Sequence, residues 1–284
     1  MIITSNNSLS LKYTVLSHGW FQLAPWKWDH HNEILSRMEP CPDDSLTLIS
    51  CSQIGPKSLF LQIPQSAFEL LDEQWINRTV NRWLSLDWDP TPAIKLSRKI
   101  DPEISNFLQN GGGRFLRGTS FYEDCIKTIL TINANWKFTI RMANEITMNL
   151  GGGVFPTPVK IIKAGSAALK RYLRLGFRAE VICEVSSQLL DKGIINEWGI
   201  LQKEDLCYED MIQFRGLGPY SVNHILMLMH DFRTIPVDSE VVRYCNQILK
   251  IESSEVQDHF ARWGNYSFLG YKLPRIIDAL SSDL

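Results

Sequence analysis

The pattern of apolar residues changes abruptly at Pro64, and this change constrains the fold more than any other feature of the chain. Before Pro64, short runs rich in β-branched and aromatic residues alternate with proline, glycine and polar turns, which is typical of an antiparallel sheet. After Pro64, apolar residues recur at helical spacing almost to Leu284. The sequence therefore predicts an α+β fold: an antiparallel sheet domain with a linking helix at residues 1–90, packed on an orthogonal helical bundle at residues 91–284. The runs expected as strands are 11–23, 45–51 and 58–63.

Several segments of the second part carry helix start signals. Ser120 and Glu123 have the spacing of a capping box at the start of a helix over residues 121–131. Thr157 is an N-cap residue, and the Pro158 that follows it suits the first turn of a short helix. Helices this short, joined by turns, indicate a bundle rather than a long coiled coil.

Length and composition exclude several classes of protein. The chain has 284 residues, 44% of them apolar, which is enough for two cores, and no apolar run approaches a membrane helix. The N-terminus lacks a basic region followed by an apolar one, so we expect a cytoplasmic protein, nucleoid-associated in a bacterium. We also expect a monomer. The six cysteines are scattered without a CxxC pair, which argues against a zinc site, an iron–sulfur cluster or a disulfide framework.

The segment from Phe214 to Asn223 holds a GxG pair between two expected helices. Gly216 and Gly218 allow a sharp turn, which exposes backbone N–H groups beside the helix that begins at Pro219. Such amides, together with the positive end of the helix dipole, suit a phosphate without any basic side chain. An ordinary turn between two helices is the alternative, because a lone GxG is a weak signal.

Asp238 stands eighteen residues after Tyr220, where Pro236 forces an extended approach to the next helix. Aspartate is a favoured N-cap residue, so capping is the alternative to a catalytic role. A hairpin that binds a phosphate, followed by one acidic residue at a helix start, resembles the helix-hairpin-helix/Gly-Pro-Asp superfamily of DNA glycosylases.

The resemblance extends over roughly residues 110–275. The segment 113–146 is similar to the paired helices that precede the hairpin in this superfamily. Residues 155–158 match its Phe-Pro-Thr-Pro turn, and residues 175–179 match its Leu-Gly-Tyr-Arg-Ala segment. The β-rich N-terminus resembles the extra domain of the 3-methyladenine (alkylpurine) and 8-oxoguanine branches. The resemblance thus implies a helical core that contains the helix-hairpin-helix motif and binds double-stranded DNA.

The resemblance also implies roles for single residues. Asp238 would be the catalytic carboxylate, and Gly216 and Gly218 would offer backbone amides to a DNA phosphate. Asn133 aligns with the side chain that relatives insert into the gap left by the flipped nucleotide, and a helix C-cap is its alternative. No cofactor is expected beyond a monovalent cation, which in several relatives is held by backbone carbonyls. Their counterparts here are Ile212, Phe214 and Leu217.

Bifunctional members of the superfamily carry a lysine where this chain has Tyr220. The resemblance therefore implies a monofunctional glycosylase of base excision repair, a hydrolase that leaves an abasic site and has no lyase step. The N-terminal domain and the missing lysine both resemble the alkylpurine branch, so an alkylated purine is the expected substrate. Oxidised, deaminated and otherwise modified bases stay open. A non-catalytic helix-hairpin-helix module is the alternative from another class, against which the presence of Asp238 argues.

A base that leaves the stack needs aromatic partners. Core packing is the alternative for each candidate, because nine tryptophans cannot all line one pocket. The candidates for the base pocket are Trp20, Phe21, Tyr220, His224, Trp263 and Tyr266, of which Tyr220 is also expected to contact DNA.

Only one segment of the chain has the positive charge expected of a DNA-binding surface. The chain has 29 basic and 31 acidic residues, a net charge of −2, so it is not a globally basic nucleic-acid binder. From Pro158 to Glu180, however, six basic residues accompany one acid. Such a positive strip is what duplex binding requires, and a solvated helix face is the alternative. The residues of the strip expected to contact DNA are Lys170, Arg171, Arg174 and Arg178.

Overall fold

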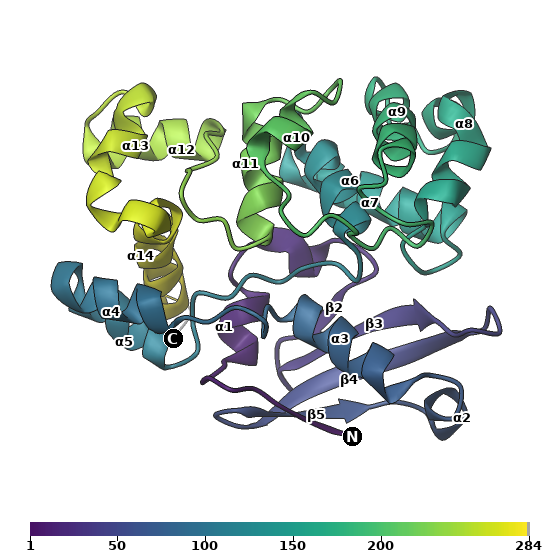
Figure 1. Cartoon of the computed structure of the whole chain (residues 1–284), viewed down its shortest axis with the longest axis horizontal. Coiled ribbons are helices and arrows are strands. Elements are labelled where there is room, and N and C mark those ends of the chain that lie inside the picture. The colour runs from purple at the N-terminus through teal and green to yellow at the C-terminus, as the bar shows by residue number, and fades with distance from the viewer. Residues whose placement is uncertain (283–284) are drawn as a thin grey trace.

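A five-stranded antiparallel sheet opens the computed structural model, which describes residues 1–282 (Figure 1). Its strand order is β1-β5-β4-β3-β2, so β2 to β5 follow one another as hairpins and β1 adds to the far edge. The predicted antiparallel sheet is confirmed. The strands are β1 (Ile2–Thr4), β2 (Lys27–Asp29), β3 (Ile34–Pro40), β4 (Leu46–Gly55) and β5 (Ser58–Gln62).

Residues 11–23 do not form the strand that we expected. They form helix α1 (Leu11–Val15) and the 3-10 helix η1 (Gly19–Gln22). Ser10 caps α1, because its hydroxyl oxygen accepts a hydrogen bond from the amide of Tyr13 at 3.2 Å. The buried side chains of α1 recur at helical rather than alternating spacing, and they are Leu11, Thr14 and Val15.

Strand β3 was not predicted, because two of its three inward positions carry charges. Leu35, Arg37 and Glu39 alternate toward the interior, and each is nearly inaccessible to solvent. Arg37 Nε lies 2.5 Å from Glu39 Oε1, so the two charges neutralise each other within the strand. The side chains of β3 alternate between the interior and the surface, but the sequence does not show this as an alternation of apolar and polar residues.

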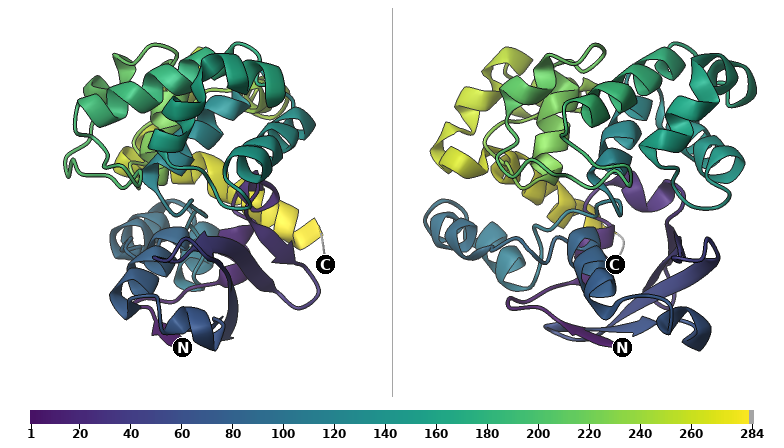
Figure 2. Two further views of the ribbon diagram at one scale, coloured as in Figure 1. Left: turned by 90° about the vertical axis from the view of Figure 1, so that its right-hand side faces the viewer. Right: turned by 45° about the vertical axis from the view of Figure 1, so that its right-hand side comes forward.

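The remainder of the described chain is mainly helical (Figure 2). The predicted caps are confirmed: Ser120 accepts a hydrogen bond from the amide of Glu123 at 3.1 Å, and Thr157 accepts one from Lys160 at 3.3 Å. The Glu123 carboxylate, however, binds the amide of Thr119 rather than completing the capping box. The helices are α2 (Gln65–Phe68), α3 (Glu73–Trp83), α4 (Thr91–Ile100), α5 (Pro102–Gln109), α6 (Phe121–Thr131), α7 (Trp136–Glu145), η2 (Ile146–Leu150), α8 (Pro158–Tyr172), α9 (Arg178–Asp191), α10 (Tyr208–Ile212), α11 (Pro219–Leu228), α12 (Ser239–Tyr244), η3 (Cys245–Leu249), η4 (Ser253–Glu255), α13 (Val256–His259), η5 (Ala261–Tyr266) and α14 (Ser267–Ser282).

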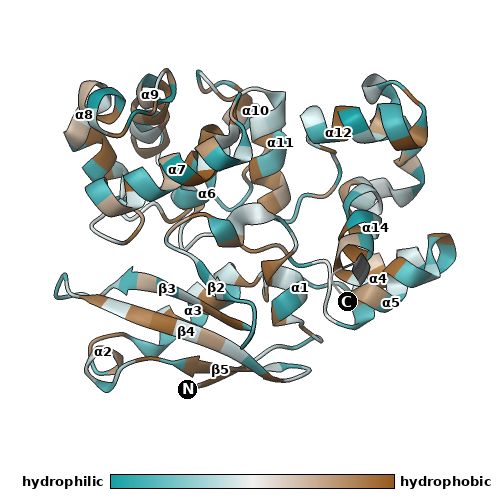
Figure 3. Cartoon of the chain, turned by 180° about the vertical axis from the view of Figure 1, so that it is seen from behind, coloured by the Kyte–Doolittle hydropathy of each residue, from teal (hydrophilic) through white to brown (hydrophobic). Residues whose placement is uncertain are grey.

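Buried apolar side chains form two clusters. One lies between the sheet, α1 and α3, and the other fills the helical part. Apolar residues run along β4, as Figure 3 shows from behind. Trp20 and Leu23, at η1, belong to the helical cluster although they precede most of the sheet in sequence. The N-terminal segment thus reaches into the helical part, where it helps to form the cleft described below. Within residues 1–282, no helix is both long and apolar enough to cross a bilayer.

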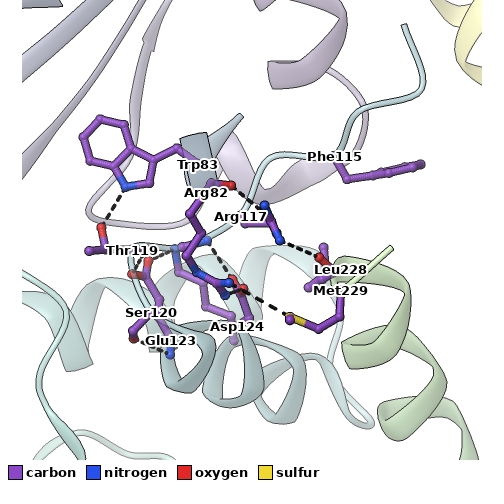
Figure 4. A network of polar contacts seen from close by, with 12 residues as sticks. Arg82, Trp83, Phe115, Arg117, Thr119, Ser120, Glu123, Asp124, Leu228 and Met229 are labelled. Atoms are coloured by element: carbon purple, nitrogen blue, oxygen red, sulfur yellow. Dashed lines mark hydrogen bonds and ion pairs between the residues drawn. The ribbon is translucent and has the colours of Figure 1, made fainter. Parts of the chain in front are cut away.

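Buried charges join the sheet to the helical part. Arg37 of β3 donates two hydrogen bonds to the Glu123 carboxylate of α6, at 3.1 and 3.0 Å. Lys127, one turn further along α6, donates to the same carboxylate at 2.6 Å. Figure 4 shows the neighbouring pair, in which Arg82 of α3 binds Asp124 of α6. We call Arg37, Glu123 and Lys127 the interface triad; all three side chains are at most 1% exposed.

Candidate active site

A cleft of about 780 Å³ lies where five separate segments of the chain and Phe115, in the loop before α6, meet. Its wall is formed by η1, the turn between α6 and α7, the hairpin between α10 and α11, the start of α12 and one face of α14. A cleft of this volume suits a small organic group rather than a flat protein contact. The residues singled out from the sequence that line it are Trp20, Asn133, Gly216, Gly218, Tyr220, His224 and Asp238.

The hairpin presents backbone amides at the edge of the cleft. Gly216 has φ +89°, and a Cβ there would lie 2.4 Å from a side-chain carbon of Val181, so this position requires glycine. Gly218 is the N-cap of α11, with Pro219 in its first turn. Among residues 1–282, neither Gly216 nor Gly218 donates its amide to another group. Two N–H groups of this kind beside a helix N-terminus suit an anion, and phosphate binding by this hairpin stays a prediction.

The same turn carries the backbone carbonyls that are predicted to hold a monovalent cation. The carbonyl of Phe214 accepts a hydrogen bond from the amide of Leu217 at 3.0 Å, which closes the turn. That bond leaves the second lone pair of this oxygen for another partner. The role of the carbonyls of Ile212, Phe214 and Leu217 in holding a monovalent cation stays a prediction.

Asp238 is both an N-cap and a cleft residue. Its Oδ1 accepts a hydrogen bond from the amide of Val241 at 2.8 Å, which caps α12. Its Oδ2 accepts no hydrogen bond within residues 1–282. The two interpretations of the sequence are therefore compatible, because capping occupies one oxygen and leaves the other beside the cleft. The catalytic role itself stays a prediction at this point.

Aromatic rings line the cleft beside Asp238. The Tyr220 ring lies 5.8 Å from His224, whose ring lies 6.0 Å from Trp20, centroid to centroid. The Tyr220 hydroxyl is 3.4 Å from the Thr131 hydroxyl. Burial raises the pKa of Tyr220, so the phenol keeps its proton at neutral pH. Burial, with a smaller effect of Lys272, lowers the pKa of His224 to about 4, so this ring is neutral.

Three aromatic residues predicted for the base pocket lie outside the cleft, so that prediction is wrong for them. Phe21 packs against the cluster of the sheet domain, with its ring edge toward His30. Trp263 is 2% exposed and lies against Gly270, where a Cβ would be 2.4 Å from the indole. Tyr266 packs on the helical core. Trp263 is a core residue, and Phe21 and Tyr266 are partly buried against the two cores, so packing, the alternative that the sequence left open, describes all three.

Asn133 lies at the rim of the cleft, in the turn between α6 and α7. Its backbone is left-handed, with φ +49°, a conformation that asparagine tolerates better than most residues. Its side chain is exposed. The turn thus has a structural reason for asparagine, and insertion of this side chain into DNA stays a prediction.

The basic strip divides into exposed and buried members. Lys170 at the end of α8 is exposed, and its ammonium lies 3.7 Å from the equally exposed Glu180. Arg171 and Arg174 are exposed as well. Arg178, by contrast, is only 4% exposed and donates a hydrogen bond to the carbonyl of Ile132. The prediction that Arg178 contacts DNA is therefore wrong: its guanidinium holds the turn that carries Asn133 at the rim.

The sequence analysis missed the contribution of α14. Phe268, Tyr271 and Lys272 of α14 line the cleft, as does Glu240 of α12. The spacing i, i+3, i+4 places the three α14 residues on one face of that helix. This spacing is readable from the sequence, but it does not reveal which element the face meets. His18 and Trp136 were missed for the same reason.

Solved structures with a similar fold were found over nearly the whole chain. A structure described as MBOgg1 in complex with a low-affinity DNA ligand matches 94% of this chain and 91% of its own, at 18% identity and a TM-score of 0.69. The 8-oxoguanine glycosylase/lyase of Clostridium acetobutylicum, in its apo form, matches 96% of each chain, at 19% identity and a TM-score of 0.68. The 3-methyladenine DNA glycosylase of Archaeoglobus fulgidus matches 95% of this chain and 97% of its own, at 16% identity and a TM-score of 0.66.

These structures share the fold that the sequence motifs predicted, an N-terminal antiparallel sheet followed by a helical part. No family model and no curated protein sequence matches the chain. At identities below 20%, the likeness concerns the fold, and the reaction depends on the residues that line the cleft.

Proposed function

We propose that this protein is a DNA glycosylase, which cleaves the N-glycosidic bond of a flipped base in duplex DNA. One observation carries the proposal: a carboxylate oxygen of Asp238 that has no hydrogen-bond partner among the described residues shares an aromatic cleft with the hairpin amides of Gly216 and Gly218, which are likewise unpaired within residues 1–282. Cleavage of this bond leaves a sugar with oxocarbenium character, which a nearby carboxylate stabilises. The hairpin amides would bind a backbone phosphate beside the flipped nucleotide.

Base release is assigned to water rather than to an amine next to the hairpin. Tyr220 occupies the position after the hairpin, and a phenol has no nitrogen with which to form an imine with the sugar. Asp238 is the general base in this proposal, because it has an oxygen available to accept a proton from water. The reaction is thus hydrolysis, with the free base and an abasic site as products.

The aromatic side chains of the cleft suit it to binding a flipped base. Tyr220, His224 and Trp20 form a continuous aromatic wall, and a flipped base stacks on such side chains. The expected preference for an alkylated purine depended partly on the N-terminal domain. That domain is matched both in a 3-methyladenine and in an 8-oxoguanine glycosylase structure, so it does not discriminate between the two substrate classes.

The proposed activity is tested by measuring released bases. Duplexes containing alkylated, oxidised or deaminated bases are incubated with the protein, and the free bases are identified by mass spectrometry. Release of one class of base, which creates an abasic sugar in the strand, is the expected result. If no base is released from any duplex while the protein binds DNA, the non-catalytic helix-hairpin-helix module becomes the better description.

The exposed part of the basic strip should contribute to DNA binding through phosphates. Replacing Lys170, Arg171 and Arg174 by alanine should weaken duplex binding and flatten its dependence on salt. Each lost phosphate contact lowers the slope of log K against log salt by about 0.9. The slope is measured by titrating labelled duplex at several salt concentrations.

A matched control removes the same charge elsewhere. Lys95, Arg98 and Lys99 are three exposed basic residues on α4, which lies far from α8 in Figure 1. Their replacement by alanine should leave the salt slope closer to that of the unchanged protein. Equal slopes for both triple variants would show that the strip faces solvent in the complex.

A further inference from the structure

Helix α14 brings an amine into the cleft from a part of the chain remote from the hairpin. Lys272 lines the cleft together with Asp238 and Tyr220, which come from the start of α12 and the start of α11. Its neighbours on the same helical face, Phe268 and Tyr271, also line the cleft. The Lys272 side chain therefore points into the space that a flipped nucleotide would enter.

The ammonium of Lys272 has no fixed partner in the described part of the chain. Within residues 1–282 it forms neither a hydrogen bond nor an ion pair. The nearby Glu240 carboxylate is bound by Arg275, which also donates to the Tyr271 hydroxyl. Glu240 forms its direct ion pair with Arg275, whereas Lys272 acts on Glu240 only through its charge, so the Lys272 amine is available to a ligand of the cleft.

Burial makes this amine more reactive than a surface lysine. Burial lowers the pKa of Lys272, Glu240 raises it, and Arg275 lowers it again, with a smaller opposing effect of Asp238; the net direction is downward. A larger fraction of Lys272 is consequently in the free amine form, which is the nucleophilic one. A partly buried lysine beside a carboxylate is a combination suited to attack on a carbonyl carbon.

We infer that Lys272 forms an imine with the aldehyde of an abasic site bound in the cleft. This inference rests on the proposed function, because base release generates the abasic sugar. It adds a second reaction to that function and revises the expectation that no lyase step occurs. That expectation considered amines only beside the hairpin, where Tyr220 stands, whereas Lys272 enters the cleft from α14.

The chemistry needs no reactant other than water. The Lys272 nitrogen adds its lone pair to C1′ of the open-chain sugar, the carbonyl oxygen takes up a proton, and water leaves to form a protonated imine. The imine acidifies the C2′ hydrogen; when that proton passes to water, the electron pair forms the C2′–C3′ double bond and the bond from C3′ to the phosphate oxygen breaks. Addition of water to the imine then releases Lys272 and leaves an unsaturated aldehyde on one strand end.

The test uses a duplex with a single preformed abasic site, together with sodium cyanoborohydride, which reduces an imine to a stable amine. The full-length protein should form a covalent adduct with this duplex, and digestion followed by mass spectrometry should map the adduct to Lys272. Lys272→Arg keeps the positive charge but cannot form this adduct, so trapping should fall to background. Lys137→Arg, at an exposed lysine near the rim, is the matched control and should trap as the unchanged protein does.

The outcomes separate the two proposals. Absence of any adduct with the unchanged protein, or an adduct mapped to another residue, would overturn the role of Lys272. Mapping in the unchanged protein decides this even if Lys272→Arg folds poorly. Base release from damaged duplexes is measured separately, so its failure would contradict the glycosylase proposal without depending on Lys272.

Discussion

Replacing Asp238 by asparagine should lower the rate of base release by about 10²–10⁴-fold, the usual range for loss of a general base. Asparagine has nearly the same size, and its side-chain oxygen can still accept the hydrogen bond from Val241 that caps α12. Folding and duplex affinity should therefore change little. The rate is measured under single-turnover conditions with the duplex that gives the most product, so that chemistry rather than product release is observed.

Asp101→Asn is the matched control for this variant. Asp101 is also an N-cap aspartate: it accepts hydrogen bonds from the amides of Glu103 and Ile104 at the start of α5, and it does not line the cleft. Its replacement should leave base release unchanged. Full activity of the Asp238→Asn variant would reduce Asp238 to a structural cap, and an equal loss in both variants would indicate a general effect of removing an N-cap charge rather than a role of Asp238 in the cleft.

Removal of the negative charge of Glu123 should destabilise the protein by about 3–5 kcal/mol, the usual cost of breaking a buried ion pair. Burial alone would raise the pKa of Glu123, but Arg37 and Lys127 overcome it and bring the pKa to about 2. Glu123→Gln keeps the shape of the side chain, leaves Lys127 buried without its anion and leaves Arg37 with Glu39 as its only anion. The free energy of unfolding is obtained from urea denaturation.

Glu180→Gln gives the comparison for an exposed pair. Glu180 lies 3.7 Å from Lys170, and both side chains are more than half exposed. Surface pairs of this kind contribute about 0–1 kcal/mol, so the unfolding midpoint should hardly move. Similar small losses in both variants would mean that the interface triad does not hold the sheet on the helical part.

Local signals predicted the parts of this protein that depend on near neighbours in sequence. The caps at Ser120 and Thr157 form as expected, because each is a hydrogen bond to an amide three residues away. The glycine hairpin and the extended approach to Asp238 follow from the conformational limits of glycine and proline. The predicted strand over residues 11–23 did not form, because the run is rich in β-forming residues but is buried at helical spacing.

Strand β3 could not be predicted because charged residues occupy its inward positions. Arg37 and Glu39 occupy inward positions of β3, where apolar residues are the ordinary signal of a strand. These buried charges are tolerated because Glu123, far away in sequence, accepts two hydrogen bonds from Arg37. No pattern within β3 could have revealed this partner, since ion pairing across elements depends on how the elements pack.

The sequence by itself determined the fold class, the hairpin and the one acidic residue that follows it, because short-range hydrogen bonds and apolar periodicity specify these features. The tertiary structure alone decided which side chains share the cleft. It excluded Phe21, Trp263 and Tyr266, buried Arg178 beneath the α6–α7 turn, and brought Lys272 in from α14. The physical reason is that a cleft is formed where remote segments leave space between them, and that space is set by the packing of whole helices rather than by neighbours in the chain.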